Sequence, residues 1–208
     1  MTDPFPIYLG DRLGLYRAMR DAGPLTSAAL AERTGLDERW VREWLRGQAA
    51  AGLLDYPGEG RFELTPEGAV ALAEEDHPAF AAGAFDGLPA QLRVLEKLPE
   101  AFRTGRGLPY DAFGEEGSRG IERSFAPWFR SLLVPLALPR LEGVVAKLGA
   151  GAEGADVGGG AGVAVIEMAR AFPKSRVRGY EISRHALDRA ERNRAEAGVG
   201  NASFHDAR

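Results

Sequence analysis

The sequence predicts a mixed fold, mainly α with an α/β part at its C-terminal end. Three helical patterns and two short apolar runs around a Pro-Gly turn lie before residue 75, and a glycine-crowded turn lies after residue 150. We therefore expect three parts: 1–75, a winged helix-turn-helix domain; 76–150, a helical connector; and 151–208, the N-terminal part of a doubly wound parallel sheet.

Composition narrows the classes of protein that this chain can belong to. Its 208 residues are 45% hydrophobic, enough for one large core or two modest ones. The sequence has no apolar run near the roughly 18 residues of a membrane span and no charged-then-apolar leader, so we expect a cytoplasmic protein. The sequence contains no cysteine, and its three histidines lack ligand spacing, so no metal site is expected. A net charge of −4 gives no general attraction to nucleic acid or anionic membrane.

The first 75 residues carry the pattern of a winged helix-turn-helix. We expect an extended, proline-bearing arm over 1–10 and then helices over 11–23, 27–34 and 37–51. Thr26 is placed to cap the second of these helices, and Asp37 begins the third. The short stretches 53–56 and 61–64, on either side of a Pro-Gly turn, predict a hairpin.

The third of these helices raises the question of DNA binding. Arg39, Arg42 and Arg46 form a stripe of the kind that a groove-reading helix carries. Residues 11–70 nevertheless hold eight arginines against ten acids, whereas a DNA-binding module should be basic. Glu38 and Glu43 are also spaced to pair with those arginines. DNA is therefore a possible but disfavoured partner, and a solvated face or a dimer contact is the favoured interpretation.

The middle of the chain predicts helices with a proline-rich interruption. A further helix begins at Thr65-Pro66, an Ala-rich apolar segment runs to Leu98, and the Gly- and Pro-rich residues 99–117 predict a connector. Residues 118–148 have a helical pattern that we expect to break near its three prolines. The aromatic cluster at 124–130 either covers a cofactor or acceptor site or packs between helix and sheet, and the second interpretation is favoured.

The stretch 155–162 predicts a strand, a tight turn and a helix. Four glycines fall within five positions, and apolar residues at i, i+3, i+4 and i+7 follow from Val165 to Phe172. Glycine reaches positive φ and leaves room for a ligand against the backbone. The pattern therefore predicts a loop that binds a nucleoside-like ligand at the carboxyl end of a strand.

The details of this loop argue against a nicotinamide enzyme. The dinucleotide fingerprint needs glycine or alanine at 163 or 165, and both positions are valine. Asp156 would also place a carboxylate against a pyrophosphate, which is unfavourable in a partly dry pocket.

Two further acids follow at predicted strand ends. Residues 176–180 predict a second strand that ends in Glu181, where a carboxylate can accept hydrogen bonds from both ribose hydroxyls. Ser183 is placed to cap a helix that ends at Gly198. A third strand over 202–204 leads into Asp206. Because parallel strands end at one edge of a sheet, these acids should lie near one another.

The spacing D-x-G-x-G-x-G from Asp156 to Gly162 resembles motif I of the class I S-adenosylmethionine-dependent methyltransferases. The order of domains resembles small-molecule O-methyltransferases whose N-terminal winged-helix domain dimerises. The resemblance implies a Rossmann-like sheet, S-adenosyl-L-methionine as cofactor, a small-molecule acceptor and a homodimer. It implies that Asp156 faces the cofactor's ammonium group and Glu181 its ribose. The cofactor-binding residues implied are Asp156, Gly158, Gly159, Gly160, Gly162, Glu181, Ile182, Asp206 and Ala207, the last two at the adenine. No catalytic residue is identifiable.

The resemblance also implies a sheet of seven strands with the first at its centre. Only three strands fit after residue 154, so we expect part of a longer methyltransferase, with one edge of the first strand unpaired and weak or absent turnover. The alternative that stays open is a winged-helix transcriptional regulator whose methyltransferase-like domain senses a ligand.

Overall fold

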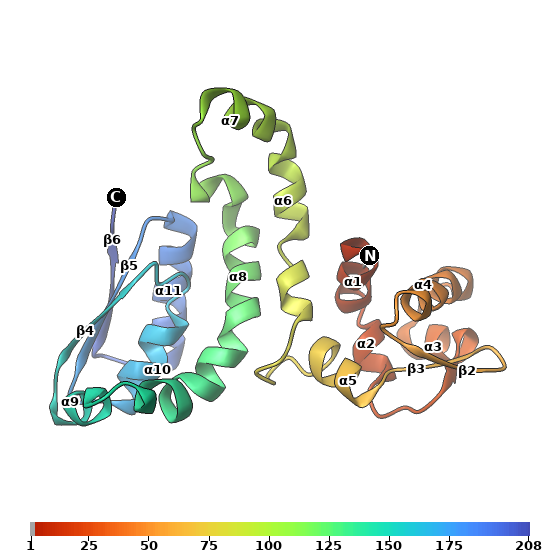
Figure 1. Cartoon of the computed structure of the whole chain (residues 1–208), viewed down its shortest axis with the longest axis horizontal. Helices are drawn as coiled ribbons and strands as arrows, with labels where there is room; N and C mark the ends of the chain where they lie inside the picture. The colour runs from red at the N-terminus through yellow and green to blue at the C-terminus, as the bar shows by residue number, and fades with distance from the viewer. Residues whose placement is uncertain (1–2) are drawn as a thin grey trace. The chain divides into compact units, whose positions relative to one another are not determined.

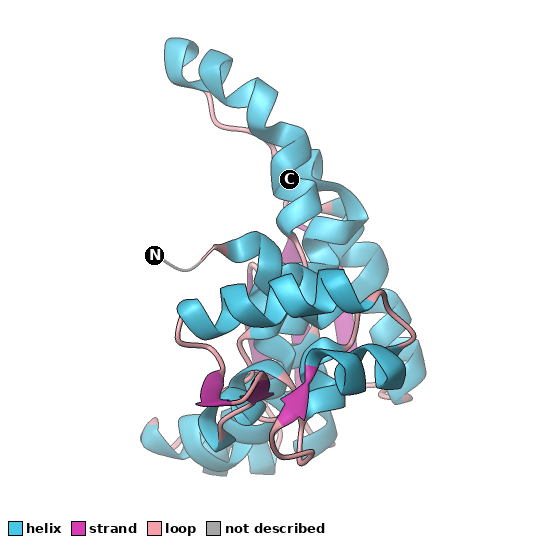
Figure 2. Ribbon diagram, turned by 90° about the vertical axis from the view of Figure 1, so that its right-hand side faces the viewer, coloured by secondary structure: helices cyan, strands magenta, loops and turns pink. Residues whose placement is uncertain are grey.

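A computed structural model describes residues 3–208 and separates them into two compact units, one ending at Leu88 and the other beginning at Pro89. Helices make up most of the chain, and the strands are short (Figure 2). The expected mixed class, with a winged-helix part, a helical connector and a partial α/β part, is confirmed.

The first unit is a winged helix-turn-helix. Its helices are α1 (Pro4–Arg12), α2 (Leu15–Met19), α3 (Ser27–Thr34), α4 (Glu38–Ala50), α5 (Pro66–Leu72) and the 3₁₀ turn η1 (Ala82–Phe85). Its antiparallel sheet has the order β1-β3-β2, with β1 at Leu25–Thr26, β2 at Asp55–Gly58 and β3 at Arg61–Glu63. The cap predicted at Thr26 is confirmed, because its side chain accepts a hydrogen bond from the backbone of the helix that follows, and Asp37 and Thr65 cap their helices in the same way.

The expected extended arm over residues 1–10 is wrong from residue 4 onward, and residues 1–2 lie outside the described part. Asp3 Oδ1 accepts a hydrogen bond from Phe5 N at 3.0 Å, which caps α1. Pro4 begins the helix, where a missing N–H costs nothing. The helix expected over 11–23 is in fact divided, because Gly14 adopts a left-handed conformation with φ of 73° between α1 and α2.

The core of the first unit includes one buried polar contact. Tyr16 is 1% exposed, and its hydroxyl donates to Gln48 Oε1 on α4. Trp44 packs edge-on against Tyr16 with ring centroids 5.1 Å apart, and its indole nitrogen donates to the Pro6 carbonyl at 2.8 Å. These contacts hold α1, α2 and α4 together.

The second unit begins with a run of helices. They are α6 (Leu88–Val94), η2 (Leu95–Lys97), α7 (Leu98–Thr104), η3 (Tyr110–Phe113), α8 (Gly114–Trp128), η4 (Phe129–Ala137), η5 (Leu138–Arg140) and α9 (Val144–Ala150). The connector expected over 99–117 thus contains α7 and the start of α8. The α-helix does end one residue after Pro127, near the first of the three expected breaks, but the chain stays helical through the π-helix η4 and the 3₁₀ turn η5 and becomes extended only at Leu141, after Pro139. Wider π-turns often absorb such interruptions in the hydrogen-bond ladder.

The α/β part has the three predicted strands. They are β4 (Glu153–Val157), β5 (Arg176–Glu181) and β6 (Ala202–Asp206), parallel and in the order β4-β5-β6. The helices α10 (Val163–Ala171) and α11 (Arg184–Ala197) pack on one face, with α8 beyond them (Figure 1). Val165 and Val177, both fully buried, lie in the core between helix and sheet. In the described chain β4 pairs only with β5.

Candidate functional site

The glycine loop between β4 and α10 closes tightly onto the end of β5. Gly158, Gly160 and Gly162 have φ of 79°, 53° and 76°, the left-handed region that favours glycine. The backbone N–H groups of Gly158 and Gly159 both donate to the Tyr180 carbonyl, at 2.8 and 3.2 Å. These two amides are therefore already used within the protein and do not form a cradle for phosphate.

Glu181 is the second element of this closure. Its side chain is 8% exposed at the carboxyl end of β5. Oε2 accepts a hydrogen bond from Gly160 N at 2.8 Å, and Oε1 accepts from Ile182 N and Ser183 N at 2.8 and 2.9 Å. The carboxylate thus holds the loop to the strand, and three N–H donors satisfy a buried charge that would otherwise be costly.

Asp156 contrasts with Glu181, because its carboxylate has no hydrogen-bond or ion-pair partner among residues 3–208. It is half-buried at the end of β4. Burial first, and the charge of Glu181 second, raise the pKa of Asp156. A Cβ atom on Gly159 would lie only 3.3 Å from Asp156 Oδ2, so a larger residue at position 159 would crowd this carboxylate. An unpaired acid beside a second acid makes the pocket attractive to a cation.

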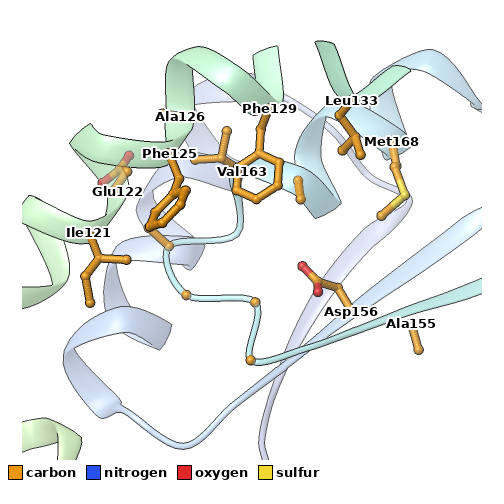
Figure 3. A pocket seen from close by; sticks show the side chains of 15 residues that line it. Ile121, Glu122, Phe125, Ala126, Phe129, Leu133, Ala155, Asp156, Val163 and Met168 are labelled. Atoms are coloured by element: carbon orange, nitrogen blue, oxygen red, sulfur yellow. The ribbon is translucent and has the colours of Figure 1, made fainter. Parts of the chain in front are cut away.

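Two cavities adjoin the glycine loop. The larger, about 420 Å³, contains Asp156 and an apolar wall that includes Phe125 and Phe129. The smaller, about 190 Å³, contains Glu181 and Ile182. Both are lined by Ile121, Gly158, Gly160 and Ala161, so a single elongated ligand can reach both acids across the loop. In Figure 3 the Asp156 carboxylate points from β4 toward the aromatic side chains above it.

The wall opposite the loop comes from α8 and η4. Its residues follow helical spacing on one face: Ile121, Glu122, Phe125, Ala126, Phe129 and Leu133. Phe125 is 56% exposed and lines the cavity together with Phe129, so the interpretation favoured from the sequence, core packing between helix and sheet, does not hold for Phe125. Helical spacing interrupted by one acid was the signal that could have identified this wall.

Glu122 was not identified from the sequence as a site residue. Its side chain is 8% exposed and forms an ion pair with Arg189 on α11. Asn193 Nδ2 donates to Glu122 Oε1 at 2.8 Å and to the Ala161 carbonyl at 3.0 Å. Unlike Asp156, this carboxylate is fully compensated, and it connects α8, α11 and the end of the glycine loop.

The structure separates the predicted site residues into two groups. Asp156, Gly158, Gly159 and Gly160 line the larger cavity, and Gly158, Gly160, Glu181 and Ile182 line the smaller one. Gly162, Asp206 and Ala207 line neither cavity.

Gly162 caps α10 in the left-handed region, and a Cβ there would lie 2.3 Å from Phe204 Cζ. This glycine therefore makes room for the core. Asp206 is the register partner of Glu181, as expected, but it is exposed and bonded to Arg208, whose Nε donates at 2.8 Å. The Arg208 hydrogen bonds lower the pKa of Asp206.

The arginine stripe on α4 is already partnered in part. Arg42 Nη1 lies 3.2 Å from Glu38 Oε2, and Arg46 Nη1 lies 3.3 Å from Glu43 Oε1. Both pairs are the ones that the sequence predicts. Pairing with acids reduces the positive potential that the stripe could offer to phosphates.

Two family models match separate parts of the chain. A model described as an Rv2258c-like winged HTH domain matches residues 5–74. A model described as a methyltransferase domain matches residues 150–208. Along the chain, the winged-helix match is followed by the methyltransferase match. The glycine loop, both acids and all three parallel strands lie within this methyltransferase match.

Known methyltransferases are similar to between about half and nearly all of the chain. The mitomycin biosynthesis 6-O-methyltransferase of Streptomyces lavendulae is 28% identical over 177 residues, 80% of this chain and 49% of the relative. The 8-amino-8-demethylriboflavin N,N-dimethyltransferase of Streptomyces davaonensis is 37% identical over 103 residues, 49% of this chain and 29% of the relative. The structure of human N-acetylserotonin methyltransferase in complex with SAM has a TM-score of 0.67 at 17% identity and covers 99% of this chain and 62% of that one.

These comparisons bear on the class of the protein. The chain spans about half the length, or less, of the two curated relatives, and both are methyltransferases, so the regulator interpretation is not favoured. The winged-helix and methyltransferase domains that the sequence predicts are confirmed. No helix in the described part of the chain is both long and apolar enough to cross a membrane.

Proposed function

We propose that this chain supplies the cofactor site of an S-adenosyl-L-methionine-dependent methyltransferase that acts on a small molecule. The observation that supports it most is the Asp156 carboxylate, half-buried and without a partner beside the buried Glu181. Such a pair of acids favours a ligand with positive charge and disfavours one with phosphates. S-adenosylmethionine carries a sulfonium and an ammonium group and no phosphate.

The two cavities suggest a division of roles among the predicted residues. Asp156 would bind the ammonium group of the methionyl part in the larger cavity, and Glu181 would accept hydrogen bonds from the ribose beside the smaller one. Gly158, Gly159 and Gly160 would let the ligand approach the backbone. Gly162 would support the loop from within the core. The remaining proposed contacts are Ile182, Asp206 and Ala207, the last two with the adenine.

The residues of the chain would orient the reaction more than take part in it. The bound cofactor supplies the electrophilic methyl group. Asp156 and Glu181 would fix the two ends of the ligand, and Phe125, Phe129 and Leu133 would form an apolar wall along the larger cavity. No side chain in either cavity is proposed as a general base.

Titration calorimetry tests this function with compounds that differ in charge. We expect the chain to bind S-adenosylmethionine and S-adenosylhomocysteine and to bind NADH and ADP at least tenfold more weakly, because the acids oppose phosphate. Asp188→Asn, which changes an exposed acid on α11 that lines neither cavity, should leave this preference among ligands unchanged. Equal or tighter binding of NADH would contradict the proposal.

We further propose that the protein is a homodimer formed through its first unit. Phe5, Leu9 and Leu13 lie at i, i+4 and i+8 on α1 and its C-cap and are 46–48% exposed. Trp40 on α4 is 77% exposed and lies one helical turn before Trp44, which contacts α1. Apolar surface of this kind often marks an interface.

Light scattering after gel filtration tests the dimer. The chain should have twice its monomer mass, and Leu9→Asp should shift it toward the monomer, whereas Glu67→Ala, an exposed change elsewhere in the unit, should not. A wild-type monomer at micromolar concentration would contradict it. DNA remains a disfavoured partner of this domain, and the absence of cysteine supports a cytoplasmic location.

A further inference from the structure

The turn η3, which precedes α8, is fastened to the start of α11. Asp111 Oδ1 accepts hydrogen bonds from Ser183 Oγ at 2.7 Å and from Arg184 N at 3.0 Å. The same Ser183 hydroxyl accepts a hydrogen bond from Ala186 N and thereby caps α11. These contacts join residues more than 70 positions apart, so η3 has a defined place at the end of β5.

The fastening places an aromatic side chain in the smaller cavity. Tyr110 immediately precedes Asp111 and lines this cavity together with Glu181 and Ile182. Ser183, to which Asp111 binds, is only two residues after Glu181. The anchor of the turn and the proposed ribose-binding acid therefore belong to one strand end.

Tyr110 and Ile182 leave much of their apolar surface uncovered. Tyr110 is 55% exposed and Ile182 is 50% exposed, although both line the same cavity. The only ring contact of Tyr110 in the described structure is with Phe113, at a centroid distance of 6.4 Å. The folded chain does not use these surfaces, and a flat ring entering the cavity would cover both.

We propose that Tyr110 binds the purine ring of the nucleoside and that Asp111 is the positioning residue that holds Tyr110 there. This inference rests on the proposed function and extends it to residues outside the methyltransferase match at 150–208. The purine lies between Tyr110 and Ile182 while Glu181 holds the ribose. The connector of the chain thus contributes one wall of the cofactor site.

Calorimetry with S-adenosylhomocysteine on the 208-residue chain tests the role of Tyr110. Tyr110→Ala weakens binding about tenfold, the usual effect of removing an aromatic ring that stacks on a base. Tyr110→Phe retains the ring and binds within about twofold of wild type. The matched control is Phe102→Ala, which removes an 88% exposed aromatic side chain on α7 that lines neither cavity. Circular dichroism confirms that each variant is folded.

The role of Asp111 is tested by combining variants. Asp111→Ala weakens binding several-fold in the wild-type chain and has little effect in the Tyr110→Ala background, because Asp111 affects binding only by positioning the Tyr110 ring. Asp111→Asn keeps an oxygen that accepts from Ser183 and Arg184, so it restores wild-type affinity. A purely structural cap would weaken binding equally in both backgrounds. The loss is also seen with adenosine as ligand and is absent with homocysteine.

Different results identify which idea fails. If the wild-type chain binds neither S-adenosylhomocysteine nor adenosine, both the proposed function and this inference are overturned. If wild type binds and Tyr110→Ala binds equally well, only the aromatic wall is refuted. An Asp111→Ala loss that is undiminished in the Tyr110→Ala background overturns the positioning role.

Discussion

Replacing Asp156 with asparagine should change stability and ligand binding in opposite directions. The carboxylate makes no hydrogen bond within the described chain, so the variant breaks no contact. Burial and the charge of Glu181 raise the pKa of Asp156 above its ordinary value of 3.8. Protonation of Asp156 therefore stabilises the folded state. This contribution is fully present below pH 3.8 and is lost as the pH rises through the raised pKa. At pH 7 the charge therefore destabilises the unliganded fold, and Asp156→Asn should melt at a higher temperature.

The same variant should bind the cofactor less tightly. A charge-assisted hydrogen bond contributes about 1.5 to 3 kcal/mol. Because Asp156 remains half in solvent, the lower part of this range applies, about 1.5 to 2 kcal/mol, which corresponds to about 10- to 30-fold in affinity. Calorimetry with S-adenosylhomocysteine and thermal melts at pH 4 and pH 7 measure the two effects. A variant that binds as tightly as wild type, or that melts lower at pH 7, would refute the reasoning.

Three further predictions concern other contacts. Glu181→Ala should weaken binding of S-adenosylhomocysteine by about 1.5 to 3 kcal/mol in calorimetry, and unchanged affinity would remove Glu181 from the site. Gly162→Ala should lower the free energy of unfolding, measured in urea, by about 1 to 3 kcal/mol, because its Cβ would meet Phe204. The control is Gly200→Ala, whose Cβ would meet open space, and equal stability of the two variants would contradict the prediction. Burial raises the pKa of Tyr16, so the wild-type protein should lose stability above about pH 10, and Tyr16→Phe should lack that loss. Melting temperatures that fall in parallel for both proteins above about pH 10 would refute this prediction.

Local chemistry explains why much of the fold was predictable. Thr26 and Ser183 cap the helices expected of them, because a side-chain oxygen one residue before a helix finds an N–H donor whatever surrounds it. The strand over 176–181 and the acid at its end also follow from local alternation and position. These features depend on residues close in the sequence.

The parts that were missed have different causes. Asp3 caps a helix that begins at Pro4, a local signal that the proline-bearing arm concealed. Pro127 and Pro135 lie inside the helices α8 and η4, which continue past them. The pairing of Glu122 with α11, 67 residues away, has no local signal at all. In the candidate site, the sequence identified both acids and the loop, whereas the wall from α8 emerged only from packing.

The hydrogen bonds that fasten the glycine loop to Tyr180 and Glu181 have a consequence for how a ligand is received. Loops rich in glycine ordinarily lose much conformational entropy when they become ordered. Here Gly158, Gly159 and Gly160 already donate to the neighbouring strand end, so that loss is incurred during folding. Their amide protons should exchange with deuterium almost as slowly as those of the strands. A ligand would therefore bind to a loop that is already ordered, and the entropic cost of binding would be smaller.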